Sequence, residues 1–337
     1  MTIVRRAPLT LRSTLTLLAL LLLVLGAAIV LGLSVGSVDV RVADVAAALF
    51  TPSHTDDASR TIVLALRLPR VLLAAVVGAG LSIAGVVFQA LLRNPLAEPY
   101  ILGISSGGTV GAIIAISVGA GFSVWGTPLA SFAGSLLVTV LVYTLAHRRG
   151  QLDTNTLLLA GVMVGAFFNA VVLLIVALFH QELRNAFLWL MGSFGSATMT
   201  ALLVVAPLVV LASGVLIIQA KKYNLIATGE ETAVQLGVDV RRLKRLTYAL
   251  GSLITGLVVS VSGVIGFVGL IIPHMCRMLF GPDHRALLPA ALVSGAAFMI
   301  VADVLARTVL APMEIPVGAV TATIGAPLFV YLLKRTE

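Results

Sequence analysis

Long apolar runs fill most of this 337-residue sequence, and they leave very few folds open to it. Only 11% of the residues are charged and 59% are hydrophobic, whereas a soluble domain carries about 25% charge. A helix that crosses a bilayer needs about 20 consecutive apolar residues, and many of these runs are that long. The sequence therefore predicts an all-α, polytopic membrane protein.

The apolar runs divide into about ten expected transmembrane helices. Seven are clear from the sequence: 14–34, 70–92, 127–146, 156–179, 199–219, 246–262 and 286–310. Of the other three, 101–119 is rich in Gly and Ser, and 264–280 and 316–334 contain Pro273 and Pro327. Broken helices are tolerated only where they face protein or a water-filled cavity, so these three favour a transport pathway.

The distribution of Lys and Arg predicts the orientation. If both termini are cytoplasmic, 16 of the 22 basic residues lie on the cytoplasmic side, as the positive-inside rule requires. These loops also account for the net charge of +8, and no soluble basic face is left for nucleic acid. We expect a single transmembrane domain, residues 1–337, with both termini inside. The six basic residues outside are Arg41, Arg60, Arg67, Arg70, Arg184 and Arg307.

One long polar segment, Lys221–Arg245, interrupts the apolar runs and carries nine of the 36 charged residues. Glu230 and Glu231 follow Gly229 and suit the positive end of a helix dipole, and Gly237 should end that short helix. A basic cluster follows at the membrane edge: Arg241, Arg242, Lys244 and Arg245. The segment is either a docking platform for a cytoplasmic partner or a solvated loop, and physics alone favours neither.

The sequence contains no recognisable catalytic centre. It lacks the G-x-x-x-x-G-K-[ST] phosphate loop, its five histidines are scattered, and its one cysteine is Cys276. We therefore expect no enzyme activity, no metal site and no cofactor in this chain. Without a ladder of buried acids or a selectivity filter, a stand-alone secondary transporter or channel is the weaker alternative.

Two smaller patterns have both a structural and a functional interpretation. Asp303 and Arg307 are four residues apart and should pair on one helix face, or Arg307 has a separate functional role. Small residues at four-residue spacing favour close helix packing over pore lining. These residues are Gly103, Gly107, Gly111, Gly161 and Gly165.

Five strings, taken together, resemble one known family over residues 15–334. They are RLPR (67–70), GAGLSIAGVVFQALLRNPLAEPYILGISSGG (78–108), GEETAVQLGV (229–238), GFVGLIIPHMCR (266–277) and EIPVGAVTATIGAPLFVYLLK (314–334). The sequence resembles the permease subunit of the type II ABC importers for iron-siderophores, haem and vitamin B12.

The resemblance implies a ten-helix permease in the bacterial cytoplasmic (inner) membrane. A second permease copy, identical or paralogous, would complete a translocation path on the two-fold axis. Two cytoplasmic ATPase subunits would bind ATP and Mg, and a periplasmic or lipid-anchored binding protein would deliver substrate. Residues 219–245 would be the segment that couples the ATPase to transport, which favours the docking interpretation of the polar segment.

The resemblance also implies roles for individual residues. Arg67, Arg70 and Arg307 would form an outer rim for the binding protein, while Asn94 and Thr154 would narrow the cytoplasmic end of the path. Asn94 could instead cap the turn at Pro95. Residues 182–196 would form a short extra helix near the gate. The ATPase contact would involve Gly229, Glu230, Glu231, Ala233, Leu236 and Gly237.

We expect import of an iron-siderophore. Vitamin B12 and haem are alternatives, because the family's binding protein and not its permease selects the substrate.

Overall fold

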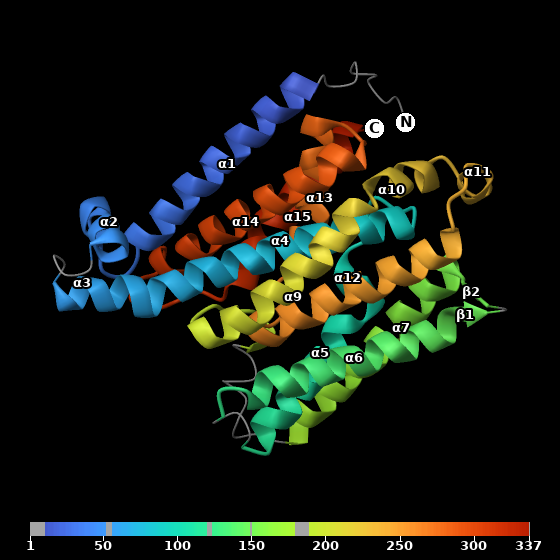
Figure 1. Ribbon diagram of the computed structural model, residues 1–337. Coiled ribbons are helices and arrows are strands. Elements are labelled where there is room, and N and C mark those ends of the chain that lie inside the picture. Colours follow the sequence, from blue (N-terminus) through green and yellow to red (C-terminus); the bar gives the residue numbers. More distant parts are fainter. Residues whose placement is uncertain (1–10, 52–55, 120–122, 149, 179–188, 337) are drawn as a thin grey trace.

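Helix α4 (Leu68–Leu91) lies at the centre of a bundle of helices (Figure 1). The computed structural model describes residues 11–51, 56–119, 123–148, 150–178 and 189–336. The residues of α4 are apolar or small on nearly every face of the helix, and most of them are buried in the bundle. It packs against four helices, α9 (Met199–Ile218), α12 (Val240–Ser262), α13 (Val268–Phe280) and α14 (His284–Thr308).

The remaining described elements lie around this core. In chain order they are α1 (Leu11–Ser34), α2 (Val42–Phe50), α3 (Asp57–Thr61), the π-helical turn η2 (Ile62–Arg67), the 3₁₀ turn η3 (Pro99–Leu102), α5 (Ile104–Ser117), α6 (Gly126–Ala146), β1 (His147–Arg148), β2 (Gln151–Leu152), α7 (Thr154–Leu178), α10 (Ala220–Ala227), α11 (Glu230–Gln235) and α15 (Val317–Thr336). Strands β1 and β2 form a small antiparallel hairpin.

The helices match the ten apolar runs of the sequence. Seven described helices are long and apolar enough to cross a membrane, and shorter apolar helices occupy 104–117, 268–280 and 317–331. These three correspond to the interrupted runs. The length and the apolar composition of a helix are properties of a local stretch of sequence, so both could be predicted without the structure.

Two helix starts differ from the expected span limits. The run expected at 70–92 begins its helical structure at Asp57, where the Asp56 side chain accepts a hydrogen bond from Ser59 N at 2.9 Å. The run expected at 246–262 begins at Val240, where Asp239 accepts from Arg242 N at 2.9 Å. Such caps extend a helix into charged sequence, which a search for apolar residues does not detect.

Glycines bring α4 into backbone contact with its neighbours. A Cβ atom added at Gly78 would lie 2.1 Å from the carbonyl oxygen of Gly295 in α14. One added at Gly85 would lie 2.0 Å from the carbonyl oxygen of Gly269 in α13. Without a side chain at these positions, the helices approach closely enough for dispersion contacts along their whole length.

The glycines at four-residue spacing make the same kind of contact elsewhere. Gly107 packs on Gly134, and a Cβ at Gly111 would lie 2.0 Å from the carbonyl oxygen of Ala130, so α5 and α6 touch directly. Gly161 of α7 packs on the backbone of Leu102. Close packing within one chain is therefore confirmed.

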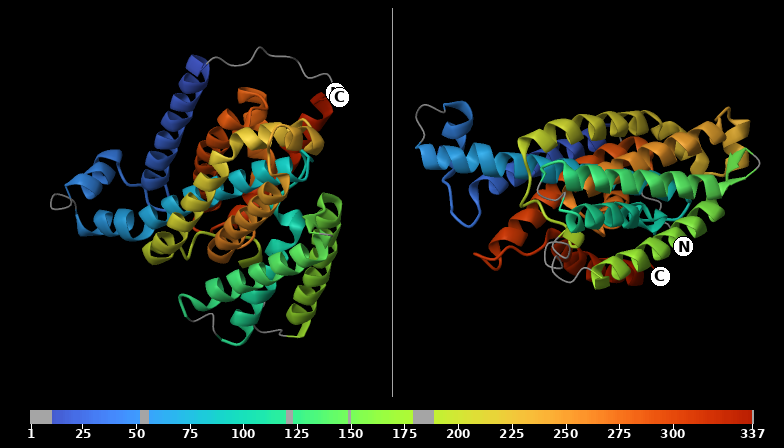
Figure 2. Two further views of the ribbon diagram at one scale, coloured as in Figure 1. Left: turned by 45° about the vertical axis from the view of Figure 1, so that its right-hand side comes forward. Right: turned by 90° about the horizontal axis from the view of Figure 1, so that it is seen from below.

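The two ends of the bundle carry different elements. Helices α10 and α11 and the β1–β2 hairpin lie at one end, and α2 and α3 lie at the other (Figure 1). Helices α5, α6 and α7 form a separate group that joins the core through α12 (Figure 2). The polar segment therefore lies at the opposite end of the bundle from α2 and α3.

Gly85→Ala should destabilise the protein by about 1–3 kcal/mol, because its Cβ would overlap the Gly269 backbone and force α4 from α13. Thermal unfolding of the purified protein in detergent, followed by intrinsic fluorescence, measures this. Gly26→Ala in α1 is the matched control, since no atom lies within 4 Å of its added Cβ. Equal melting temperatures for the two variants would contradict the close contact.

Candidate functional site

The polar segment folds into two short helices, α10 and α11. Helix α11 begins at Glu230 and ends before Gly237, as the sequence predicts. Gly229 and Gly237 have φ values of +130° and +83°, in a region that side chains disfavour. The two glycines therefore set the limits of α11, and Glu230 and Glu231 fill its first turn.

Helix α10 is held to two of the core helices. The hydroxyl groups of Tyr223 and Thr247 in α12 are 2.9 Å apart. Asn224 donates to Asp283 at 2.7 Å and accepts from the backbone N–H of His284 at 2.9 Å, at the start of α14. Hydrogen bonds from Arg285 and Asn224 hold the pKa of the Asp283 carboxyl well below its usual range, so this anchor stays ionised.

Lys244 joins three helices through one buried ammonium group. Its Nζ lies 2.6 Å from Glu230 Oε1 of α11 and donates to Thr154 Oγ1 of α7 at 3.1 Å. Its side chain is only 9% exposed, and a buried ammonium is stable only with such partners. The polar segment is thus bonded directly to Thr154, one of the two residues expected at the gate.

Sequence reasoning placed Lys244 in a basic cluster and missed this connection. A signal was available, because Val240, Leu243, Lys244 and Thr247 follow the i, i+3, i+4, i+7 spacing of a buried helix face. The other basic residues of the cluster, Arg241, Arg242 and Arg245, are exposed. A lysine on the buried face of an amphipathic helix indicates a partner within the protein.

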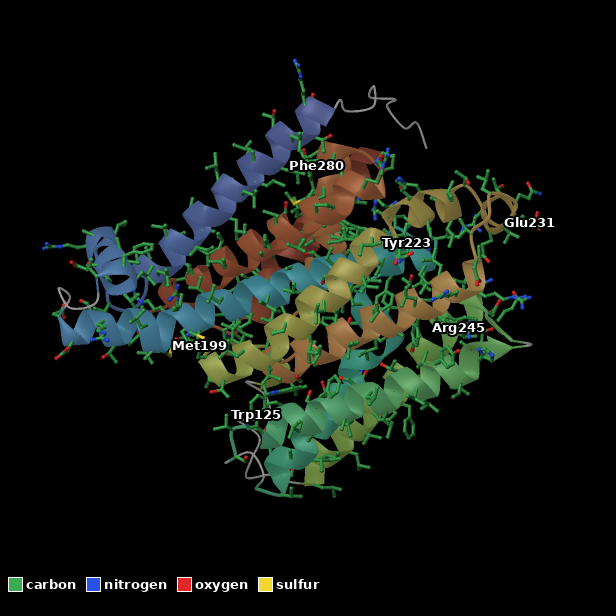
Figure 3. All side chains as sticks on the ribbon, viewed as in Figure 1. Trp125, Met199, Tyr223, Glu231, Arg245 and Phe280 are labelled. Atoms are coloured by element: carbon green, nitrogen blue, oxygen red, sulfur yellow. The ribbon has the colours of Figure 1, made fainter. Side chains whose placement is uncertain are left out.

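Helix α11 exposes apolar surface at the end of the bundle. Ala233 is fully buried beneath the helix, whereas Val234 is 59% and Leu236 is 60% exposed. Glu231 is exposed beside them and points away from the bundle (Figure 3). Apolar side chains grouped on a charged surface are typical of contact sites for other proteins.

Asn94 lies in the loop that follows α4. Its side-chain oxygen accepts a hydrogen bond from Leu96 N at 2.9 Å, which is the local cap of the Pro95 turn. Gln89 holds the same loop, donating to Ala97 O and to Gly269 O at 3.2 Å each. The cap is therefore present, and a pathway role for Asn94 stays a prediction.

Arg70 is the centre of an ion cluster at the opposite end of the bundle. Its Nε and Nη2 donate to the Asp303 carboxylate at 3.0 Å, and its Nη1 donates to Glu314 at 2.8 Å. Asp303 is 1% exposed, and Arg307 lies 3.6 Å from it. The expected pairing of Asp303 with Arg307 is present, but Arg70 is the closer partner.

Arg67 and Arg307 do not form the exposed rim that the sequence suggested. Each is only 6% exposed, and each donates to carbonyl groups at the C-terminal end of α1. Arg67 reaches Leu33 O at 2.8 Å and Ser34 O at 2.7 Å, and Arg307 reaches Gly32 O at 2.5 Å. Those carbonyls have no partner within the helix, so the two arginines cap it. A role of the three arginines in docking a binding protein stays a prediction. Of the three, Arg70 is the one that lies near the surface.

Two other expectations concern a short helix at 182–196 and the absence of a metal site. Of the short helix expected at 182–196, residues 182–188 lie outside the described residues, and the helix ends at Leu190, so 191–196 are not helical. Among the residues that the structure describes, no group of three or more His, Cys, Asp or Glu side chains could hold a metal ion.

Comparison with known proteins matches this architecture to one family. The model of the FecCD transport family matches residues 21–335, nearly the whole chain. The chain belongs to this family. It is similar to the cobalamin import system permease protein BtuC of Halobacterium salinarum, with 45% identity over 83% of this chain and 75% of the relative. It is also similar to the hemin transport system permease protein HmuU of Yersinia pestis, with 43% identity over 84% and 86% of the two chains.

A solved structure has the same fold. It is an inward-facing conformation of a metal-chelate type ABC transporter, with a TM-score of 0.85 and 34% identity over 95% of this chain and 99% of that one. This chain is therefore a multi-pass membrane permease of an ABC importer.

Asp303→Asn should destabilise the protein by about 3–5 kcal/mol, because it removes the buried carboxylate that Arg70 and Arg307 share. The melting temperature of the detergent-purified protein measures the loss. Glu314→Gln is the control, since Glu314 is 48% exposed and its ion pair is worth about 1 kcal/mol or less. A melting temperature for Asp303→Asn as high as that of Glu314→Gln would show that the buried pair does not stabilise the fold.

Proposed function

We propose that this chain forms the transmembrane pathway of an ATP-driven importer that carries a bulky iron chelate into the cytoplasm. Relatives named for cobalamin and hemin import support a large metal chelate as the substrate class. An iron-siderophore is our first candidate, and vitamin B12 and haem are the second. Two copies of the chain, or one copy and a paralogue, would enclose the path.

The bond of Lys244 to both Glu230 and Thr154 is the observation that carries this proposal. An ATP-driven importer must transmit movement from its ATPase to its gate. Glu230 lies in the segment that would contact the ATPase, and Thr154 lies at the start of α7, where the gate is expected. A movement of α11 would therefore change the surroundings of Thr154 through a single side chain.

The ATPase would dock on the exposed surface of α11. Val234 and Leu236 would enter a groove of the partner, and Glu231 would pair with a basic residue there. ATP and Mg would bind to the partner, since this chain has no phosphate loop. A binding protein would deliver the chelate at the opposite end, near Arg70 and Glu314, in the periplasm or at the outer face of the bacterial inner membrane.

Uptake of the chelate into proteoliposomes should require the ATPase subunit and ATP. The double variant Val234→Asp/Leu236→Asp should abolish both the co-purification of the ATPase and the uptake. Buried carboxylates without partners would oppose the docking. Lys222→Ala, exposed on α10, is the control and should keep both. Competition between ferric siderophore, cobalamin and hemin identifies the substrate. Uptake that proceeds without ATP would support a stand-alone carrier or channel instead.

Lys244→Met should uncouple ATP hydrolysis from transport while the complex still assembles. The ATP consumed per chelate imported should rise by about 5- to 150-fold, the range of a typical coupling free energy. Adding Glu230→Gln to Lys244→Met should change little further, because both remove the same contact.

Comparing Lys244→Met with the wild-type complex distinguishes a failure of the Lys244 link from a failure of the proposed function. If Lys244→Met imports with normal efficiency, the link through Lys244 is wrong although the importer function stands. If the wild-type complex itself shows no ATP-dependent uptake, the proposed function is wrong.

A further inference from the structure

A narrow groove of about 400 Å³ runs along the outside of the bundle between α6 and α12. Its walls are largely apolar and include Phe132, Leu136 and Val140 from α6, and Ala249 and Leu253 from α12. Both helices are long and apolar enough to cross a membrane. The groove therefore lies at the depth of the lipid chains.

The groove has one polar end and one apolar end. Arg245 and Tyr143 lie at the end near the polar segment, and Phe132 and Gly256 lie at the other. The twelve residues from Arg245 to Gly256 span about 16 Å of helix. The Tyr248 hydroxyl of α12 donates to Thr139 O of α6 at 2.9 Å, and this bond connects the two helices that form the groove. The groove is thus long and narrow, and its two walls are directly connected.

Arg245 is an exposed cation at the mouth of the groove. It makes no hydrogen bond or ion pair with any residue that the structure describes. Two of its basic neighbours on α12 are engaged, since Arg241 lies against the side-chain amide of Gln151 and Lys244 binds Glu230. A charge in this position is available to an anion at the membrane surface.

We propose that the groove binds an anionic phospholipid, with one acyl chain along α6 and α12 and the phosphate against Arg245. An acyl chain fits a narrow apolar channel, and a cation between helices at the membrane edge attracts an anionic headgroup. An apolar helix of a second copy in the same place would leave the charge of Arg245 without an anionic partner, whereas a phospholipid supplies both the apolar chain and the anion.

Native mass spectrometry of the detergent-purified full-length protein tests this site, with phosphatidylglycerol and phosphatidylcholine of identical chains as probes. Wild-type protein should retain phosphatidylglycerol preferentially. Arg245→Gln should lower that preference about fivefold, the effect of one basic residue at an anionic surface. Ala249→Phe should lower retention of both lipids, because the ring fills the groove.

Arg242→Gln is the matched control, because Arg242 is also exposed on α12 but lies outside the groove. It should keep the wild-type preference. An equal loss in Arg242→Gln and Arg245→Gln would show diffuse attraction to basic residues and overturn the site. So would unchanged lipid retention in Ala249→Phe, or no preference between the two lipids in the wild type. Arg245→Gln removes no internal contact, so its result stands even where Ala249→Phe fails to fold.

Discussion

Direct backbone contact at glycines fixes the position of α4, and the features at both ends of the bundle depend on it. Gly78 meets Gly295 of α14, and Gly85 meets Gly269 of α13. Helix α14 in turn carries Asp303 at one end and His284 at the other. The ion cluster and the anchor of α10 are therefore positioned by the same close packing, since densely packed interiors transmit displacement with little local adjustment.

Much of the fold could be predicted from the sequence, because apolar length and helix-ending glycines are local signals. The ten runs and the limits of α11 are examples. The burial of Arg67 and Arg307 could not be predicted, since their partners lie 34 and 275 residues away from them in the chain. Lys244 lies 90 residues from Thr154, and its spacing indicated only that it faces inward. Long-range pairing of polar groups depends on the packed arrangement and is not visible in any local pattern.

The two ends of the bundle use charge in different ways. At the end with α2 and α3, Arg67, Arg70 and Arg307 are matched by acids or by the carbonyls of α1, so their charge serves mainly to hold helices together. At the other end, Lys244 is enclosed, while Glu231 and the neighbouring arginines of α12 face solvent. The first three charges thus stabilise the fold, and the exposed charges near α11 are available to partners and to the membrane surface.

Helix α1 is attached to the bundle in an unusual way. Only 11% of its most apolar stretch is buried, and its firmest bonds run from arginine side chains to the carbonyls at its end. Carbonyl groups are the same in every residue, so these bonds do not depend on which side chains α1 carries. Its lipid-facing positions should accept any apolar residue, whereas inserting or deleting one residue just before Gly32 would rotate the chain end by about 100° and separate it from both arginines. For the arginine contacts of this helix, its length therefore matters more than the identity of the side chains that face the lipid.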